Sequence, residues 1–233
     1  MPGGAARASV PAMPLALVTG AARPNSIAAA VVPRLVADGW DVATSDLHDV
    51  DHPCDLSDPE GPDRLVAEVT AARGPVSALV LSHAYDVESG ILGTTAESLD
   101  LHHAVNARAS LLLIAAFARQ VPADGGAVVA LTSDHTTGNL AYGASKGSLD
   151  RIVISAAREL GPLKISANVL NPGPVDTGWM TPEIRDALVA DHPIGRLGTP
   201  QDVAEVVAFL VSPPGRWVSG QLLHSDGAYS ARY

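Results

Sequence analysis

Cysteine is almost absent from this 233-residue chain, because Cys54 is the only one. A single thiol cannot form a disulfide within the chain, which excludes the disulfide-stapled secreted scaffolds and indicates a reducing compartment. Cys54 could serve as a nucleophile, but we favour a buried or merely exposed thiol without a chemical role.

Positive charge is also scarce. Lys and Arg number 15 against 25 Asp and Glu, so the formal net charge is −10. This balance disfavours nucleic acid or an anionic membrane as the main partner. A small-molecule ligand stays open even if it is anionic, because helix N-termini bind phosphate without cationic side chains.

Long apolar runs are lacking as well. No stretch of about 18 apolar residues occurs, so we expect no membrane span. Residues 1–12 are small and rich in Pro and Gly, without the basic start and apolar core of a signal peptide, and we expect a disordered tail. The predicted location is the cytoplasm. The whole chain is 47% hydrophobic with a mean hydropathy of +0.19, which argues against disorder of the domain as a whole.

Aromatic residues make up only 4% of the chain, and a high content of Ala and Val suits close packing of helices on a sheet. Short apolar runs alternate with helical patterns, which is typical of βαβ units and a parallel sheet. We predict one doubly wound, Rossmann-type α/β domain over 13–233, with about seven strands and helices on both faces. The predicted strands are 15–19, 41–45, 76–82, 126–132, 165–170 and 221–224, and the predicted helices are 26–37, 60–73, 96–119, 142–160 and 200–212.

A turn of small residues follows the first predicted strand. It reads Thr19-Gly20-Ala-Ala-Arg-Pro-Asn-Ser26-Ile-Ala28 and leads directly into a helix. Such a turn lets backbone amides and the helix N-terminus approach a pyrophosphate. However, the G-x-G-x-x-G pattern is absent, because Gly20 is the only glycine here. An ordinary strand-to-helix turn therefore remains the alternative.

Two charged residues near this turn give opposite indications about a dinucleotide. Asp46 ends the second predicted strand, where a Rossmann carboxylate bonds the adenosine ribose hydroxyls and repels a 2′-phosphate. Arg23 lies in the turn, and its guanidinium could pair with that phosphate. We favour NAD(H), with NADP(H) as the alternative. A solvated strand end is the other interpretation of Asp46.

The most informative pair of residues is Tyr142 and Lys146. Positions i and i+4 share a helix face, so both groups can point at one reacting atom. A free tyrosine has a pKa near ~10, and a cation beside it favours the phenolate, bringing the pKa toward a useful range. Ser133 ends the preceding predicted strand, at the carboxyl edge of the sheet, where ligands of open α/β sheets bind. An unrelated surface pair is the alternative.

These features resemble the short-chain dehydrogenase/reductase superfamily. Most members carry T-G-x-x-x-G-x-G at the first turn, whereas a divergent branch that includes bacterial enoyl reductases carries G-x5-S-x-A, which Gly20, Ser26 and Ala28 match. The resemblance covers nearly the whole chain from Leu15 onward. Further matches are Asn171-Pro-Gly-Pro-Val-Asp-Thr177, Arg196-Leu-Gly-Thr-Pro-Gln-Asp-Val203, Ser219-Gly-Gln221 and Asp226-Gly227.

The resemblance implies a nicotinamide cofactor and residues to hold it. Asp55-Leu56 would hold the adenine ring, Val175 and Thr177 the nicotinamide carboxamide, and Lys146 the nicotinamide ribose. The residues expected to contact the cofactor are Gly20, Arg23, Ser26, Ile27, Asp46, Asp55, Leu56, Ser82, His83, Tyr142, Lys146, Pro172, Gly173, Val175 and Thr177.

The resemblance also implies the chemistry, a hydride transfer that interconverts a ketone and a secondary alcohol. Tyr142 would be the general acid/base, Ser133 would stabilise the developing alkoxide, and Lys146 would lower the Tyr142 pKa. Asn106 would bend its helix and hold a water of a proton relay. Asn is a mediocre helix former, so its place inside a helix needs a reason, although a solvent-facing Asn is the alternative.

The chain departs from the family pattern at two places. The family usually has N-N-A-G after the strand at 76–82, but the sequence here is Leu-Ser-His83-Ala, so His83 either borders cofactor or substrate or is structural. Ser133 precedes Tyr142 by nine residues rather than about twelve or thirteen, which predicts a loop shorter by about four residues and a more open wall. The candidate substrate contacts are His83, Asp134, His135, Trp179 and Met180.

Two other functions stay open. An enoyl reductase is suggested by the first turn, although those enzymes use Tyr-x6-Lys, and the Tyr-x3-Lys spacing here favours carbonyl chemistry. A cofactor-binding regulator without catalysis is the other. The adjacent residues His102 and His103 would face different ways on a helix, so we expect no metal. By resemblance we also expect a homotetramer or homodimer, joined through the helices that carry Asn106 and Tyr142.

Overall fold

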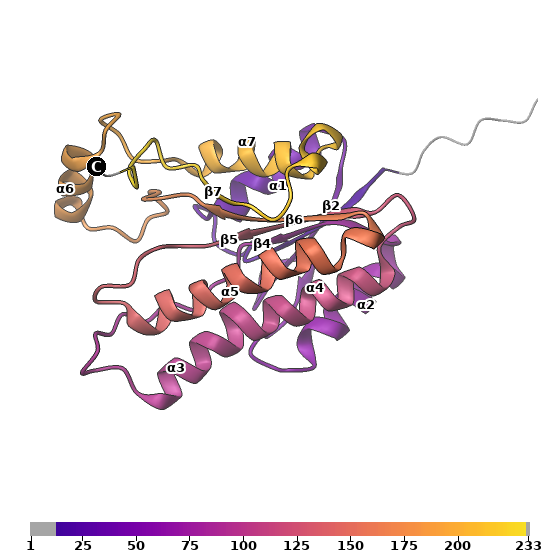
Figure 1. Cartoon of the computed structure of the whole chain (residues 1–233), viewed down its shortest axis with the longest axis horizontal. Helices are drawn as coiled ribbons and strands as arrows, with labels where there is room; N and C mark the ends of the chain where they lie inside the picture. Colours follow the sequence, from indigo (N-terminus) through magenta and orange to yellow (C-terminus); the bar gives the residue numbers. More distant parts are fainter. Residues whose placement is uncertain (1–12, 232–233) are drawn as a thin grey trace, which may run out of the picture.

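Seven parallel strands form a single sheet in the computed structural model, which describes residues 13–231 (Figure 1). The strand order is β3-β2-β1-β4-β5-β6-β7, which confirms the predicted α/β class. The predicted tail, residues 1–12, lies outside the described residues. The strands are β1 (Leu15–Thr19), β2 (Asp41–Asp46), β3 (His52–Pro53), β4 (Val76–Leu81), β5 (Gly126–Leu131), β6 (Ile165–Asn171) and β7 (Leu222–His224).

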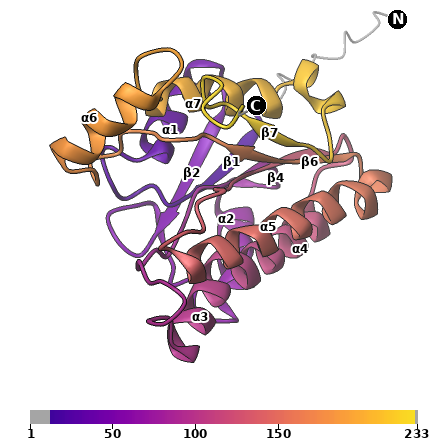
Figure 2. The ribbon, with the colours of Figure 1, turned by 60° about the vertical axis from the view of Figure 1, so that its left-hand side comes forward.

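Helices cover both faces of this sheet. One face carries α1 and α7, which pack on each other, and the other carries α2, α4 and α5 (Figures 1 and 2). A π-helical segment, η1, joins α3 to α4, and two short 3-10 turns, η2 and η3, lie near the C-terminal strands. The bounds are α1 (Ile27–Ala37), α2 (Gly61–Arg73), α3 (Ala96–His102), η1 (His103–Arg108), α4 (Ala109–Gln120), α5 (Leu140–Glu159), η2 (Gly161–Leu163), α6 (Pro182–Asp191), α7 (Pro200–Val211) and η3 (Pro213–Trp217).

The core is divided by the sheet into two apolar clusters. Alternate residues of a strand face opposite sides, so Leu17 packs on the α2, α4 and α5 side while Ala16 and Val18 pack toward α1 and α7. Both faces are covered, and every residue of β1, β5 and β6 is buried. This burial explains why β1 and β5 are almost continuous apolar runs rather than alternating patterns, while β6 buries three polar side chains among its apolar ones.

The strand order reverses beside β1, which pairs with β2 on one side and with β4 on the other. In open α/β sheets a crevice forms at such a point, outside the carboxyl ends of the strands. The loops that follow β4, β5 and β6 gather at this edge, at the left-hand end of the sheet in Figure 1. This edge is where a ligand site is expected.

Several elements differ from the predictions. Helix α5 begins at Leu140, two residues earlier than predicted, and η1 interrupts the predicted helix 96–119. Helix α6 was not predicted; none of its residues is buried, and Ile184, Leu188 and Val189 form only a short apolar stripe on it. Strand β3 was also missed, since two residues are too few to show a period.

The continuous helix Ala96–Gln120 is long and apolar enough to cross a membrane by length and composition alone. This does not contradict the predicted lack of an uninterrupted run of about 18 apolar residues, because polar residues such as Asn106 and Arg108 interrupt the helix. In the fold this helix contacts α2, α5 and β4, and 56% of its most apolar window is buried. A core helix of a folded domain passes the same test, because its apolar face covers a sheet.

Candidate active site

Tyr142 and Lys146 lie together at the beginning of α5. Tyr142 is in the first turn and Lys146 is one turn later, with its Nζ 5.7 Å from the centroid of the Tyr142 ring. The helix starts at the carboxyl edge of the sheet, where its N-terminal dipole also favours negative charge. The structure therefore puts the phenol and the ammonium at the edge where a ligand would bind.

Ser133 follows β5 by two residues, and its side chain is near enough to the Tyr142 phenol to oppose the rise of the Tyr142 pKa. Its Oγ also accepts a hydrogen bond of 3.1 Å from the backbone N–H of His135, which fixes the hydroxyl. The unusual spacing of nine residues thus still brings the hydroxyl to the phenol.

The pKa of Tyr142 is raised, not lowered. Burial is the largest cause and the Asp86 carboxylate adds to it, whereas the Ser133 side chain acts in the opposite direction. The net direction is therefore opposite to the fall that was expected from Lys146, because desolvation of the phenolate dominates. At neutral pH the phenol is protonated, which is the form that can donate a proton.

Lys146 is only 3% exposed, and its Nζ donates a hydrogen bond of 2.9 Å to the carbonyl oxygen of Leu131 at the end of β5. Burial lowers the pKa of Lys146 to about 8, while the carboxylates of Asp150 and Asp86 oppose that fall. At pH 7 the lysine keeps its charge, and two carboxylates help it do so.

Asn106 lies in η1 with no exposed surface and makes three side-chain hydrogen bonds. Its Oδ1 accepts from the N–H of Tyr85 at 2.8 Å, and its Nδ2 donates to the Tyr85 carbonyl at 2.9 Å and to Ser145 Oγ at 2.8 Å. Ser145 Oγ in turn donates to the Tyr142 carbonyl at 2.7 Å. Asn106 therefore clamps the loop after β4 and, through Ser145, the first turn of α5. The solvent-facing alternative for Asn106 is wrong.

The turn after β1 is shaped by Gly20, which has φ +75°. A Cβ at this position would lie 2.7 Å from the backbone carbonyl of Ser82 and 2.8 Å from the N of His83, so only glycine fits. Ser26 caps α1, its Oγ accepting from Ala29 N at 3.1 Å. The result is a close-packed turn that leads into a capped helix N-terminus, and Ile27 is the first residue of that helix.

Asp46 and Arg23 both make contacts within the protein. The Asp46 carboxylate accepts hydrogen bonds from Ala22 N at 2.9 Å and Leu47 N at 2.8 Å, so it is anchored to the first turn. Arg23 reaches in the other direction: its Nη2 donates to the Thr177 carbonyl at 2.9 Å, and its guanidinium lies 4.0 Å from the centroid of the Trp179 ring. Arg23 thus joins the first turn to the loop after β6.

Both ring nitrogens of His83 have partners within the protein. It is 9% exposed, and its Nδ1 lies 2.7 Å from Thr19 Oγ1, while its Nε2 lies 3.2 Å from the Val105 carbonyl and 3.3 Å from Ser110 Oγ. A carbonyl can only accept, so Nε2 carries the proton and Nδ1 accepts from Thr19. Burial lowers the pKa of His83 to about 3 and keeps the ring neutral. These contacts favour the structural interpretation over a cofactor or substrate contact.

The loop after β6 is held in a fixed shape. Gly173 has φ +62°, and a Cβ there would lie 2.5 Å from the Cβ of Asp226. Its N–H donates to Asn171 Oδ1, and Val175 forms a bridge with Gly198. Buried Pro172 and partly buried Thr177 lie in the same loop. The P-G-x-x-x-T segment therefore packs against the C-terminal segment and meets the first turn through Arg23.

The remaining predicted residues are spread along the same edge. Ser82 donates its N–H to Thr19 Oγ1, Asp55 is exposed, and Leu56 is 7% exposed and packs into the core. The other candidate substrate contacts are three exposed residues, Asp134, His135 and Trp179, and the partly buried Met180.

Both histidines of the adjacent pair have structural partners. His102 donates from Nδ1 to the Ser98 carbonyl and accepts at Nε2 from Val87 N, whereas His103 bonds the Leu99 carbonyl. No group of three or more His, Cys, Asp or Glu suited to a metal is found between residues 13 and 231. Cys54 is buried, and that burial raises the pKa of its thiol, which suppresses the reactive thiolate.

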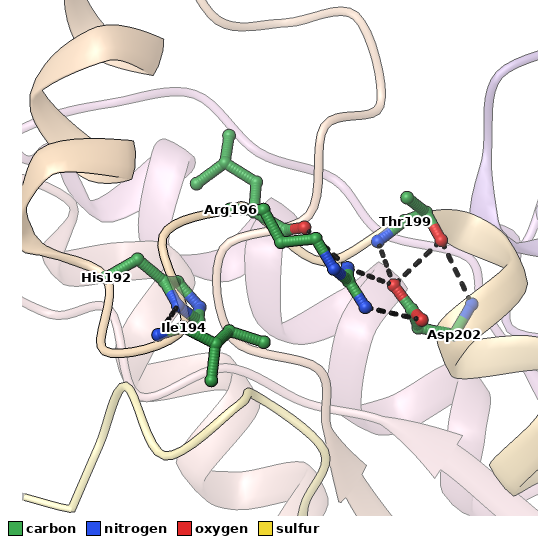
Figure 3. A network of polar contacts seen from close by, with 6 residues as sticks. His192, Ile194, Arg196, Thr199 and Asp202 are labelled. Atoms are coloured by element: carbon green, nitrogen blue, oxygen red, sulfur yellow. Dashed lines mark hydrogen bonds and ion pairs between the residues drawn. The ribbon is translucent and has the colours of Figure 1, made fainter.

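A cavity of about 310 Å³ lies under the C-terminal segment, away from Tyr142. Its lining includes His192, Arg196 and Asp202, and Figure 3 shows the contacts that organise it. Arg196 forms a two-pronged ion pair with Asp202 at 2.7 and 3.0 Å. Asp202 also accepts from Thr199 N while Thr199 Oγ1 accepts from Asp202 N, a reciprocal cap of α7. The R-L-G-T-P-Q-D segment thus begins a helix rather than building the reaction site.

Four residues of the site were not predicted. Ser145 lies within Tyr142-Gly-Ala-Ser-Lys146, and its place between the two candidate residues is a signal that could have drawn attention to it. Tyr85, Asp86 and Asn139 carry no such signal, because only the folded chain brings the loop after β4 to the start of α5. Asn139 precedes α5 and donates from Nδ2 to Asp86 Oδ1 at 2.7 Å.

Comparison with known proteins finds relatives over almost the whole chain. A family model described as enoyl-(acyl carrier protein) reductase matches residues 20–230. The uncharacterized oxidoreductase YjdA of Bacillus subtilis is 33% identical over 241 residues, which cover 92% of this chain and 96% of the relative.

Solved structures agree with this result. A short-chain dehydrogenase/reductase from Serratia marcescens BCRC 10948 superimposes with a TM-score of 0.86 at 28% identity, over 95% of this chain and 100% of that chain. A blue fluorescent protein from a metagenomic library, solved in complex with NADPH, superimposes with a TM-score of 0.85 at 30% identity, over 93% and 98%.

Proposed function

The chain belongs to the short-chain dehydrogenase/reductase superfamily, and from that premise we propose that it interconverts a ketone and a secondary alcohol with a nicotinamide cofactor. The observation that carries this proposal is the meeting of three groups at the carboxyl edge of the sheet. The Ser133 side chain is near enough to the Tyr142 phenol to act on its pKa, and the Lys146 ammonium lies 5.7 Å from the centroid of the Tyr142 ring.

The residues at the first turn fit a dinucleotide. The only group that can occupy position 20 is a glycine, because the backbone after β4 fills the place of a side chain. That close approach leaves the capped N-terminus of α1 at the edge of the crevice, where backbone N–H groups and the helix dipole favour a pyrophosphate. Ser26 and Asp46 would flank the cofactor on the side of the adenosine ribose.

The cofactor would supply or take up the hydride when bound, and the protein would manage the proton. In reduction, the Tyr142 hydroxyl donates its proton to the oxygen of the substrate carbonyl as that oxygen gains charge. The raised pKa of Tyr142 suits this direction, because the phenol stays protonated at neutral pH. The Ser133 hydroxyl holds the same oxygen, and the Lys146 ammonium stabilises the phenolate that remains.

A substitution of Tyr142 tests this assignment. Tyr142→Phe removes one hydroxyl and is expected to abolish NADH oxidation across a panel of ketones, while the affinity for NADH, measured by fluorescence titration, stays close to that of the wild type. Tyr229→Phe is the matched control, because this tyrosine stacks on His192 in the C-terminal segment. Near-normal turnover by Tyr142→Phe would contradict the assignment of Tyr142 as the general acid/base.

For the choice of cofactor we propose NAD(H), on the charge of Asp46. The carboxylate is anchored by two backbone amides and keeps lone pairs free for ribose hydroxyls, whereas a 2′-phosphate beside it meets like charge. The NADPH bound to the metagenomic relative supports the other choice. The ratio of kcat/KM for NADH and NADPH distinguishes them, and Asp46→Asn is expected to shift that ratio toward NADPH.

An enoyl reductase is the second candidate. The description of the matching family model and the Gly20, Ser26 and Ala28 turn favour it. The spacing of Tyr142 and Lys146 and the presence of Ser133 near the Tyr142 phenol favour the carbonyl reaction instead. Parallel assays with a ketone panel and with 2-enoyl thioesters separate the two reactions. A regulator without catalytic activity would bind NADH but would not oxidise it with either the ketones or the 2-enoyl thioesters.

Assembly and location follow the same premise. We propose a homotetramer or homodimer formed through α4 and α5, where Leu111 exposes 48% of its surface on α4. Light scattering coupled to gel filtration measures the mass. We propose the cytoplasm as the location, on the single, buried Cys54, and fractionation of the cells tests it.

A further inference from the structure

The loop between β4 and α3, residues 82–95, is fastened to the beginning of α5. Leu140 N donates to the Ser89 carbonyl at 2.9 Å, and Asn139 Nδ2 donates to Asp86 Oδ1 at 2.7 Å. Asn106 holds Tyr85, the neighbour of Asp86, by both its N–H and its carbonyl. In Figures 1 and 2 this loop lies beside the start of α5 at the carboxyl edge. Asp86 therefore occupies a fixed place next to the turn that carries Tyr142.

The carboxylate of Asp86 is exposed, but the amide that holds it is not. Asn139 is 1% exposed and lies three residues before Tyr142. An exposed acidic side chain on an unrestrained loop samples many conformations. The hydrogen bond of 2.7 Å from the buried Asn139 amide restricts the Asp86 carboxylate to a narrow range of positions. Asp86 is thus a positioned negative charge at the mouth of the site.

Asp86 also acts on the atoms that would react. Its charge raises the pKa of both Tyr142 and Lys146, so its field reaches the phenol and the ammonium. The segments 82–95 and 132–139, which border the start of α5, contain three acids and no Lys or Arg. An anionic substrate would meet repulsion in this region, and a cationic one would meet attraction.

We propose that Asp86 selects substrates in which a positively charged group lies close to the reacting carbonyl. The proposal rests on the ketone reduction described above and adds the class of ketone. A quaternary or protonated amine one or two bonds from the carbonyl would stand beside the Asp86 carboxylate while the carbonyl oxygen meets Tyr142 and Ser133.

Two ketones of the same shape, one cationic and one neutral, separate the effect of the substrate's charge from the effect of its size. Acetonyltrimethylammonium carries a permanent cation, and 4,4-dimethylpentan-2-one has a carbon in place of the nitrogen. The ratio of their kcat/KM values is measured for the wild type, for Asp86→Asn and for Glu88→Gln. Asp86→Asn keeps an oxygen that can accept from Asn139 and removes the charge. Glu88→Gln is the matched control, because Glu88 is an exposed acid of the same loop. The intrinsic reactivities of the ketones cancel when the ratio is compared between variants.

We expect Asp86→Asn to reduce the preference for the cationic ketone by about tenfold, which corresponds to the removal of about 1.4 kcal/mol of attraction. Glu88→Gln should leave the ratio within about twofold of the wild type. An equal ratio in the wild type and in Asp86→Asn overturns the role of Asp86 and leaves the ketone reduction standing. If the wild type reduces neither of these ketones nor any ketone of the wider panel, both the ketone reduction and the role of Asp86 are overturned.

A binding measurement supplies a readout without turnover. In Tyr142→Phe loaded with NADH, calorimetry gives the dissociation constants of the two ketones with and without Asp86→Asn. Selective weakening of the cation by Asp86→Asn supports the proposal, and equal weakening of both ketones contradicts it. Thermal unfolding of each variant excludes a loss of fold as the cause.

Discussion

Replacement of Lys146 by methionine should make the folded chain more stable at neutral pH while it abolishes turnover. Lys146 is 3% exposed, and burial lowers its pKa from 10.5 to about 8. A base with a lowered pKa in the folded state holds its proton less firmly there than in the unfolded chain, so the charge opposes folding. Methionine fills a similar volume and carries no charge to desolvate.

The magnitude follows from the two pKa values. At about 1.4 kcal/mol per pH unit, a fall from 10.5 to about 8 costs the wild type about 3 kcal/mol at pH 7, where both states are protonated. At pH 9.5 the folded chain has released this proton while the unfolded chain retains it, and the remaining cost is about 1 kcal/mol. The hydrogen bond from Lys146 to the Leu131 carbonyl, which methionine cannot make, offsets about 1 kcal/mol of this cost in the wild type at both pH values.

Urea denaturation at pH 7 and pH 9.5 measures the difference. Lys146→Met should have a free energy of unfolding about 2 kcal/mol above the wild type at pH 7, and the two should be nearly equal at pH 9.5. Lys164, the other lysine of the chain, is exposed, and Lys164→Met serves as the control without this pH dependence. If the difference in the free energy of unfolding between Lys146→Met and the wild type is the same at both pH values, Lys146 is not a buried, charged lysine with a lowered pKa.

Three further substitutions test the framework around the site. Gly20→Ala introduces a Cβ 2.7 Å from backbone at φ +75°, and should lower the free energy of unfolding by about 1–3 kcal/mol and weaken NADH binding in a fluorescence titration. Asn106→Ala leaves two backbone groups of Tyr85 without their partner, and should cost about 1–3 kcal/mol by denaturation and lower kcat more than it raises KM. Arg23→Met removes the bond to the loop after β6 and the contact with Trp179, worth about 0.5–1 kcal/mol; stopped-flow fluorescence should show faster release of NADH, and an unchanged rate would contradict it.

The architecture was readable from the sequence where elements are buried. The strands β1, β5 and β6 are largely apolar because a parallel sheet is covered on both faces, although β6 also buries Ser166, Asn168 and Asn171. Each of these strands was predicted within one or two residues. Helix α6 escaped prediction for the opposite reason, since no residue of it is buried. Hydrophobic patterns report burial, so an element that contributes no buried residue to the core gives only a weak signal.

The site was readable in part. Tyr142, Ser133 and Lys146 were identified as a set because they lie near one helix start and one strand end, and the structure brings them together. The direction in which the Tyr142 pKa shifts was not predicted correctly. It depends on how far the fold removes water from the phenol and on the charge of Asp86, which lies in a different loop. Spacing along the chain carries no information about either quantity.

The π-helical segment η1 is the one place where the helix that contains it can lose a residue and keep its register. A π-helical turn is closed by hydrogen bonds from i to i+5, so it holds one residue more than an α-helical turn. Deletion of one residue from His103–Arg108 would therefore convert the segment to ordinary α-helix and leave α3 and α4 in the same relative orientation. A deletion in α4 before Leu113 would instead rotate the rest of that helix by about 100°, and Leu113 and Phe117, both almost fully buried, would turn away from the core.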